Sequence, residues 1–145
     1  MDPETAGDIR TVLIDPVSIA VERWTDPACG TIGWQTLLSA GLTPSSGLTC
    51  GIATLEPGED FTLHCHPQPE LYLGLEGTAV VMVDGLPRPM QRETLLFIPG
   101  GAVHGIPPVT ERFRYFYCFA TDSFAQVAYS FLPAPGTPPS ERTSA

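Results

Sequence analysis

The chain has 145 residues, of which 43% are hydrophobic, and its net charge is −9 at pH 7. This length predicts one domain with a sizeable core, and no apolar run reaches the ~20 residues of a membrane helix. All the basic residues are arginines, seven against sixteen acidic residues, so nucleic acids and anionic membranes are poor partners for the surface. The four cysteines lack CxxC spacing and no secretory leader is visible, so we expect reduced thiols and a cytoplasmic protein.

The first 46 residues contain only short predicted elements. Residues 9–15 predict a short strand, residues 16–24 one helical turn, and residues 30–40 a longer strand. The strand at 30–40 lies outside the regular pattern that follows it. We therefore expect residues 1–46 to form an extension that packs on the main domain or exchanges with a partner subunit.

From residue 47 the pattern becomes regular, with short apolar runs separated by turn sequences such as Pro-Gly, Asp-Gly and Pro-Pro. This pattern is typical of an antiparallel β-sandwich or barrel over residues 47–132. The predicted strands are 48–55, 60–64, 70–75, 79–83, 94–98, 103–106, 112–119 and 127–132, with a short helical segment at 121–126. The proline-rich residues 133–145 predict disorder.

All three histidines lie in the two turn-rich motifs of this pattern. His64 and His66 share one face of an extended strand, and a proline-containing turn lets Glu70 face back toward them. His104 follows a Pro-Gly-Gly turn and can enter from a neighbouring strand. The four side chains predict a metal site of three histidines and one carboxylate, suited to Fe(II), Mn(II), Ni(II), Co(II) or Zn(II). The alternative is that they are ordinary polar residues at a barrel mouth.

Tyr72 lies two residues after Glu70 and should point to the same side. A phenol ordinarily has a pKa of ~10, but a divalent cation nearby favours the phenolate, which can act as a base. The alternative is a tyrosine that only forms part of the wall. The residues alone favour neither interpretation.

The spacing of these residues resembles the two motifs of the cupin family. From Gly58 to Gly77, the glycines, the two histidines and the glutamate match the first motif at every position, and residues 99–104 match the Pro-x-Gly-x-x-His core of the second. Glu93 and Pro108 depart from the second motif, at a usual glycine and a usual asparagine, and neither is a metal ligand. The resemblance implies an all-β fold, a double-stranded β-helix or jelly-roll barrel, with a short N-terminal strand and helix extension.

A second resemblance is to the small cupin-type dimethylsulfoniopropionate (DMSP) lyases. It rests on residues 45–48, on the pair Glu70 and Tyr72, and on residues 121–129. It implies that Tyr72 is the base that removes the α-proton of the substrate. The metal ligands that it implies are His64, His66, Glu70 and His104.

The activity implied is that of a metal-dependent carbon–sulfur lyase, which splits DMSP into dimethyl sulfide and acrylate by β-elimination. We expect Fe(II) first among the metals and a homodimer as the assembly. The positive sulfonium head favours aromatic faces, and the resemblance and the inward face of residues 112–119 indicate where they lie. The expected substrate contacts are Tyr129, Tyr117 and Tyr115, and Trp34 is a further candidate for the wall, as is Trp24, since the residues do not choose between the two tryptophans.

Two other functions stay open at this point. One is an Fe(II)-dependent dioxygenase with the same four ligands, since cupins host many reactions. The other is a non-catalytic cupin that binds a metal and a small carboxylate.

Overall fold

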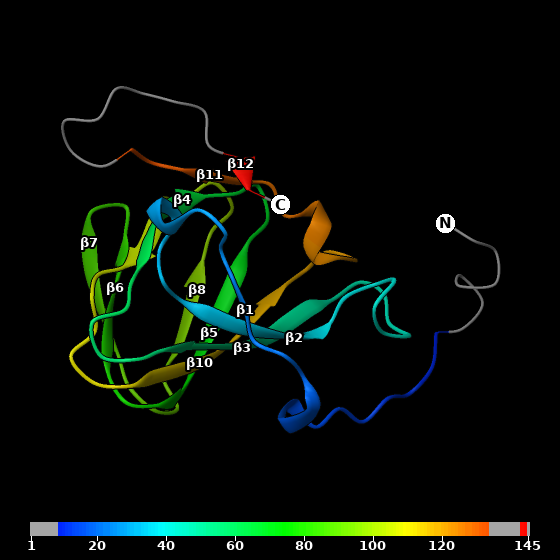
Figure 1. The fold of residues 1–145 in the computed structure, drawn as a ribbon. Coiled ribbons are helices and arrows are strands. Elements are labelled where there is room, and N and C mark those ends of the chain that lie inside the picture. Colours follow the sequence, from blue (N-terminus) through cyan, green and yellow to red (C-terminus); the bar gives the residue numbers. More distant parts are fainter. Residues whose placement is uncertain (1–8, 134–142, 145) are drawn as a thin grey trace.

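The computed structural model describes residues 9–133, 143 and 144. Two six-stranded antiparallel sheets face each other and enclose one core (Figure 1). This arrangement is the all-β barrel that the strand pattern and the cupin motifs predict. Among the described residues, no helix is long and apolar enough to cross a membrane.

Sheet A has the strand order β1-β2-β3-β10-β5-β8. Its strands are β1 (Glu22–Arg23), β2 (Gly33–Leu38), β3 (Thr49–Leu55), β10 (Phe113–Phe119), β5 (Glu70–Glu76) and β8 (Leu95–Ile98). Sheet B has the order β12-β11-β4-β9-β6-β7. Its strands are β12 (Thr143–Ser144), β11 (Tyr129–Phe131), β4 (Phe61–Cys65), β9 (His104–Ile106), β6 (Ala79–Val83) and β7 (Leu86–Met90).

The core lies between the sheets because alternate residues of each strand point inward. On β10 the buried residues are every second one, Phe113, Tyr115, Tyr117 and Phe119. Arg114 and Phe116 alternate with them and are only partly buried. The predicted inward face of aromatic side chains is therefore confirmed for this strand.

The prediction for the N-terminal extension is partly wrong. Residues 9–15 form no strand; the Arg10 N–H donates to the Pro44 carbonyl at 3.1 Å, but this contact is not part of a strand ladder. The predicted helical turn is present as the 3-10 helix η1 (Pro16–Ser18), capped by the Asp15 carboxylate, which accepts a hydrogen bond from the Val17 N–H at 2.9 Å. A second 3-10 turn, η2 (Pro27–Cys29), was not predicted.

Strand β7 was also missed, since Pro87 and Pro89 interrupt its sequence. Both prolines are tolerated because β7 is the edge strand of sheet B, where one side of the backbone needs no partner. The helical segment expected at 121–126 is shorter than predicted and contains only the 3-10 turn η3 (Phe124–Gln126). In the tail predicted to be disordered, residues 143 and 144 pair with β11, and residues 134–142 and 145 lie outside the described part of the chain.

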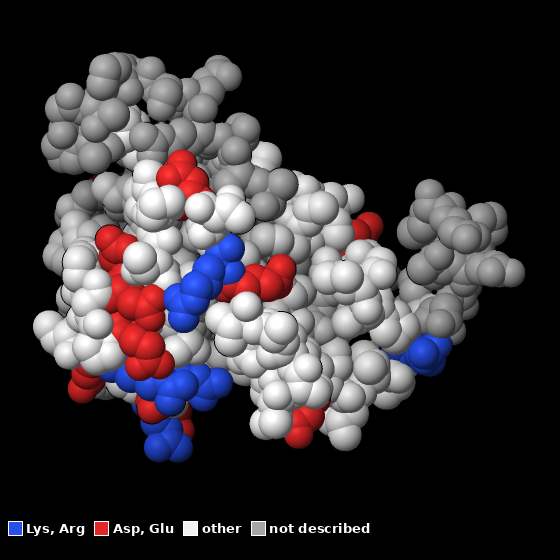
Figure 2. Space-filling view, in the orientation of Figure 1, with Lys and Arg blue, Asp and Glu red and all other residues white. Residues whose placement is uncertain are grey.

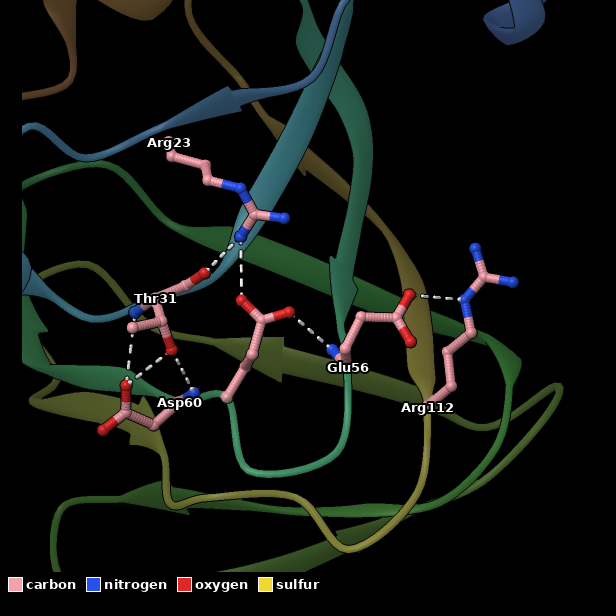
Figure 3. A network of polar contacts seen from close by, with 6 residues as sticks. Arg23, Thr31, Glu56, Asp60 and Arg112 are labelled. Carbon is pink, nitrogen blue, oxygen red and sulfur yellow. Dashed lines mark hydrogen bonds and ion pairs between the residues drawn. The ribbon is translucent and has the colours of Figure 1, made fainter.

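A polar network attaches the extension to the barrel (Figure 3). The Arg23 guanidinium on β1 donates hydrogen bonds to the Thr31 carbonyl at 2.5 Å and to the Glu59 carboxylate at 2.8 Å. The Asp60 carboxylate accepts from the Thr31 N–H at 3.2 Å, and the Asp60 N–H donates to the Thr31 hydroxyl at 3.0 Å. These contacts fix the segment that carries Trp24 against the start of β4.

Candidate metal centre

Three buried histidines meet inside the barrel. His64 lies on β4, His66 directly follows it, and His104 opens β9. One nitrogen from each ring lies within 4.8 Å of the other two. The cluster forms because β4 and β9 are neighbours in sheet B, with His64 and His104 directly opposite each other.

Backbone carbonyl groups orient all three rings. The Nδ1–H groups of His64, His66 and His104 donate to the carbonyls of residues 62, 68 and 102, at 2.7, 2.9 and 2.9 Å. A carbonyl oxygen can only accept, so Nδ1 carries the proton in each ring. The Nε2 lone pair of each neutral imidazole is thereby left for another partner, as in metal-ligating histidines.

The fourth group, Glu70, stands at the start of β5 in the opposite sheet. Its Oε1 atom lies 3.2 Å from Nε2 of His66 and 3.3 Å from Nε2 of His104. In neutral rings these nitrogens are acceptors, and an ionised carboxylate is also only an acceptor. Nε2 of His64 is buried without any hydrogen-bond partner. A cation among these four atoms would be attractive to the facing acceptor atoms and would give Nε2 of His64 a partner. The four side chains therefore fit a divalent metal.

The protonation state of His64 agrees with this arrangement. Burial lowers its pKa well below the usual value, and the neighbouring His104 and His66 lower it further. The ring is fully buried and stacks on Phe61, with the ring centres 4.1 Å apart. His64 is therefore held in the neutral form, which is the form that binds metals.

A small aromatic cavity of ≈ 20 Å³ adjoins Glu70. Four of its lining residues, Tyr115, Tyr117, Tyr129 and Trp34, are those expected from the sequence to contact a substrate. The others are Trp24, Ile32, Ala53, Phe61, Glu70 and Phe124. A much wider hollow of ≈ 760 Å³ lies beside β6 and β7, but no histidine or acidic residue lines it.

Tyr72 lies close to the cluster but is not among the residues that line the cavity. It is fully buried, with its ring centre 6.2 Å from that of His104 and 4.2 Å from that of Tyr115. Its hydroxyl makes no hydrogen bond of full geometry, and its polar neighbour is the Tyr115 hydroxyl. Burial, followed by the negative charge of Glu70, raises its pKa well above the usual value.

Sequence reasoning missed four lining residues, Ile32, Ala53, Phe61 and Phe124. Phe61 is three residues before His64, so strict strand alternation places the two on opposite faces. The pairing of β4 with β9 shifts register between these residues, and both side chains end up buried. Phe124 lies in the turn η3, where no strand or helix periodicity applies.

Residues 51–115 match the family model described as "Cupin domain". Over 118 residues the chain is 37% identical to dimethylsulfoniopropionate lyase DddW of Ruegeria pomeroyi. The matched region covers 81% of this chain and 78% of the relative. Over 70 residues the chain is 44% identical to tetracenomycin polyketide synthase protein TcmJ of Streptomyces glaucescens. This matched region covers 45% of this chain and 47% of the relative. The solved structure of the polyketide cyclase RemF from Streptomyces resistomycificus aligns with a TM-score of 0.70 over 86% of this chain and 88% of that one. The sequence identity is 16%, so this likeness supports the fold alone.

Proposed function

The chain belongs to the cupin superfamily and, within it, to the family of its DMSP lyase relative, and from this membership we propose that it is a metal-dependent DMSP lyase. The observation that carries the proposal is the buried cluster of His64, His66, His104 and Glu70 beside an aromatic cavity. The cluster supports a divalent metal, and the aromatic walls suit a sulfonium head. Fe(II) is the metal that we propose.

A divalent metal held at this site would supply a Lewis acid toward the substrate carboxylate, which would make the α-proton more acidic. The histidines and Glu70 would hold it. Their Nδ1 contacts to backbone carbonyls fix the three rings before any ligand arrives, so little reorganisation is needed at the site.

Tyr72 is the proposed general base. In its phenolate form, which a bound divalent cation would favour against the effect of burial, Tyr72 takes the α-proton and becomes a neutral phenol. The electrons of the C–H bond form the carbon–carbon double bond, and the β-carbon–sulfur bond breaks. The sulfur leaves as neutral dimethyl sulfide and therefore needs no proton donor. The Tyr115 ring packs against Tyr72 and also lines the cavity, so these two rings would have to move for Tyr72 to reach a substrate there.

The walls of the cavity would hold the substrate's cationic end. Tyr115, Tyr117, Tyr129 and Trp34 offer ring faces to a sulfonium, and Glu70 supplies negative charge nearby. The cavity as it stands has room for about one water, so its aromatic walls would have to move apart to admit even a small zwitterionic carboxylate. The cytoplasm stays the compartment that we predict.

The test is the release of dimethyl sulfide into the headspace above the full chain, incubated with DMSP and one divalent metal at a time. We expect release with Fe(II) and none with the metal-free protein. Oxygen consumption is measured in the same vessels. Oxygen uptake without dimethyl sulfide would replace the lyase by a dioxygenase, and metal binding without either product would indicate a binding protein.

A further inference from the structure

Two of the four cysteines face each other on the outer side of sheet A. Cys50 on β3 and Cys118 on β10 are directly paired in the antiparallel register of these strands. Cys118 points outward, because Tyr117 and Phe119 on either side of it are buried in the core. Directly paired residues share a face of the sheet, so the Cys50 side chain lies beside that of Cys118.

The spacing of the pair suits a disulfide bond. Opposite residues of an antiparallel pair have Cα atoms ~4.5–5.5 Å apart, within the ~4.4–6.8 Å that a disulfide spans. The two thiols are close enough to affect each other, since burial and then the neighbouring Cys118 raise the pKa of Cys50 to about 11. The Cys118 thiol makes only a long hydrogen bond, 3.9 Å to the Phe119 carbonyl, so little holds it away from Cys50.

The surroundings of the pair keep both thiols protonated. Leu38 is the other cross-strand partner of Cys50. Leu71 is the other partner of Cys118, and burial raises the pKa of Cys118 as well. Arg112 forms its ion pairs just before the start of β10, at the far end of that strand, and Figure 2 shows charged side chains gathered mainly on one side of the view. Apolar neighbours do not stabilise a thiolate, so the resting form of the pair is two thiols.

We propose that Cys50 and Cys118 are a redox modification site, at which a low-molecular-weight disulfide such as oxidised glutathione forms a disulfide bond within the chain. Cys118 is the more exposed of the two, so its thiolate attacks the glutathione disulfide and releases one glutathione. Cys50 then loses its proton and attacks the Cys118 sulfur, which releases the second glutathione. The two cysteine thiols are oxidised, the glutathione disulfide is reduced, and the two protons end on the glutathione thiols.

The spacing also makes this bond reversible. The Cβ atoms of directly paired strand residues lie ~4.5–5.5 Å apart, whereas a disulfide holds them at ~3.5–4.5 Å. The two strands must therefore approach slightly to close the bond, and a strained disulfide is easily reduced. Such a bond suits a protein whose thiols are reduced at rest, because disulfides in reducing compartments are transient.

The bond would close a loop around the candidate metal centre. The chain from residue 50 to residue 118 contains the whole cluster of His64, His66, Glu70 and His104. A cross-link restricts the unfolded chain and thereby stabilises the folded one, more so for a long loop. Oxidation would thus stabilise the folded arrangement of the cluster even when no metal links the sheets. The inference does not depend on the reaction that the site performs.

The test is incubation of the full chain with oxidised glutathione, with and without a metal chelator, followed by analysis without reductant. We expect the free thiols to fall from four to two in both samples. The mass of the single chain should fall by about 2 Da, for the two hydrogen atoms lost. Tm should rise by roughly 5–10 °C, and excess reduced glutathione should restore the original Tm and all the thiols.

Two variants identify the thiols that react. Cys118→Ser changes a half-buried side chain without adding bulk, and its Tm should not respond to oxidised glutathione. Cys50→Ala removes the second thiol, so glutathione should stay attached to Cys118 and add its mass to the chain. Circular dichroism verifies that each variant is folded before oxidation.

Cys65→Ser is the matched control, because Cys65 is also half-buried on a strand but pairs with Ser130. This variant should keep the full rise in Tm. A thiol count that stays at four, a disulfide between two chains, or a stable glutathione adduct on the wild type would overturn the proposal. A bond that still forms in Cys118→Ser, or one that is lost in Cys65→Ser, would overturn it too.

Discussion

At the scale of residues, several buried side chains of the candidate site carry polar atoms without a full hydrogen bond. Each histidine of the cluster has its Nδ1–H satisfied by a carbonyl. Nε2 of His64 and the Tyr72 hydroxyl are buried without a full hydrogen bond, and so are Nε1 of Trp34 and the Tyr117 hydroxyl in the cavity wall. Of these four residues, the proposed chemistry uses His64 and Tyr72. Such atoms cost about 1–3 kcal/mol each unless a ligand completes them. The two residues are thus the sharpest places to test the proposed chemistry.

Replacing Tyr72 with phenylalanine removes the proposed base and keeps the ring. We expect kcat for dimethyl sulfide release to fall by at least ~100-fold, the usual contribution of a general base. Metal content should stay at the wild-type level, because the four proposed ligands are unchanged. Gas chromatography of the headspace and metal analysis of the same sample measure both quantities.

Tyr72→Phe also separates a base from a wall residue. A wall residue would raise KM and leave kcat within a few-fold of the wild type. Because burial raises the pKa of Tyr72, wild-type kcat should increase with pH as long as the protein stays folded. The same slope in Tyr72→Phe as in the wild type would contradict the assignment of the base.

The lowered pKa of His64 predicts that the metal-free protein loses stability in acid. Its pKa is lowered in the folded state, so below pH ~6.5 the unfolded chain binds a proton that the folded chain does not. The free energy of unfolding should therefore fall as the pH drops, by up to ~1.4 kcal/mol per pH unit from this residue. Urea unfolding at pH 7.5, 6.5 and 5.5 measures it.

The variant His64→Gln is the comparison for this pH series. Its unfolding free energy should depend less steeply on pH, whatever its absolute stability. Equal slopes in the two proteins would show that His64 is not the buried neutral residue described.

At the scale of elements, the strand pattern predicted that His104 can enter from a neighbouring strand, and the structure identifies the pairing as that of β4 with β9. Two-residue spacing put His64 and His66 on one face, and the neighbouring strands β4 and β9 bring His104 to them. The same alternation on β10 correctly placed Tyr115 and Tyr117 inside. These predictions succeeded because regular strands follow period two.

The failures lie where local regularity ends. Phe61 reaches the cavity through an irregular register that no alternation pattern predicts. The two prolines of β7 argued against a strand at this position, because proline is tolerated in a strand only at the edge of a sheet. Residues 9–15 have the composition of a strand, but strand formation needs a partner, and the sequence of one chain does not say which segment supplies it.

The two glycines that bound the first motif should respond differently to alanine. Gly58 and Gly77 both have positive φ, at 88° and 74°, so either change strains the backbone by ~1–2 kcal/mol. A Cβ at Gly58 meets nothing within 4 Å, whereas one at Gly77 would overlap the Arg112 carbonyl. We expect Gly77→Ala to lower the free energy of unfolding by a further ~1–3 kcal/mol. Equal losses in urea unfolding would contradict this account.

At the scale of the molecule, the candidate metal centre joins the two sheets. Glu70 lies on β5 of sheet A, whereas His64 and His104 lie on sheet B. A metal bound by all of them would link the sheets through the core. Anything that binds only the folded state stabilises it, by about 2.7 kcal/mol at a hundred times its Kd.

Removal of the metal should therefore lower Tm by roughly 5–10 °C, and re-addition should restore it. His104→Gln should lose most of this metal-dependent shift. Cys65→Ser is the control, because Cys65 sits between two proposed ligands but is not part of the cluster. Scanning calorimetry with and without a chelator measures the shift. A shift unchanged in His104→Gln would place the metal elsewhere.

The central claim is that the buried histidine and glutamate cluster, loaded with metal, eliminates dimethyl sulfide from DMSP. The most direct measurement is headspace dimethyl sulfide from anaerobic wild-type protein after metal removal and again after re-addition of Fe(II). The account predicts no release from the metal-free protein and release restored by Fe(II) in the absence of oxygen. No release from the fully loaded protein, or equal release from the metal-free protein, would contradict it.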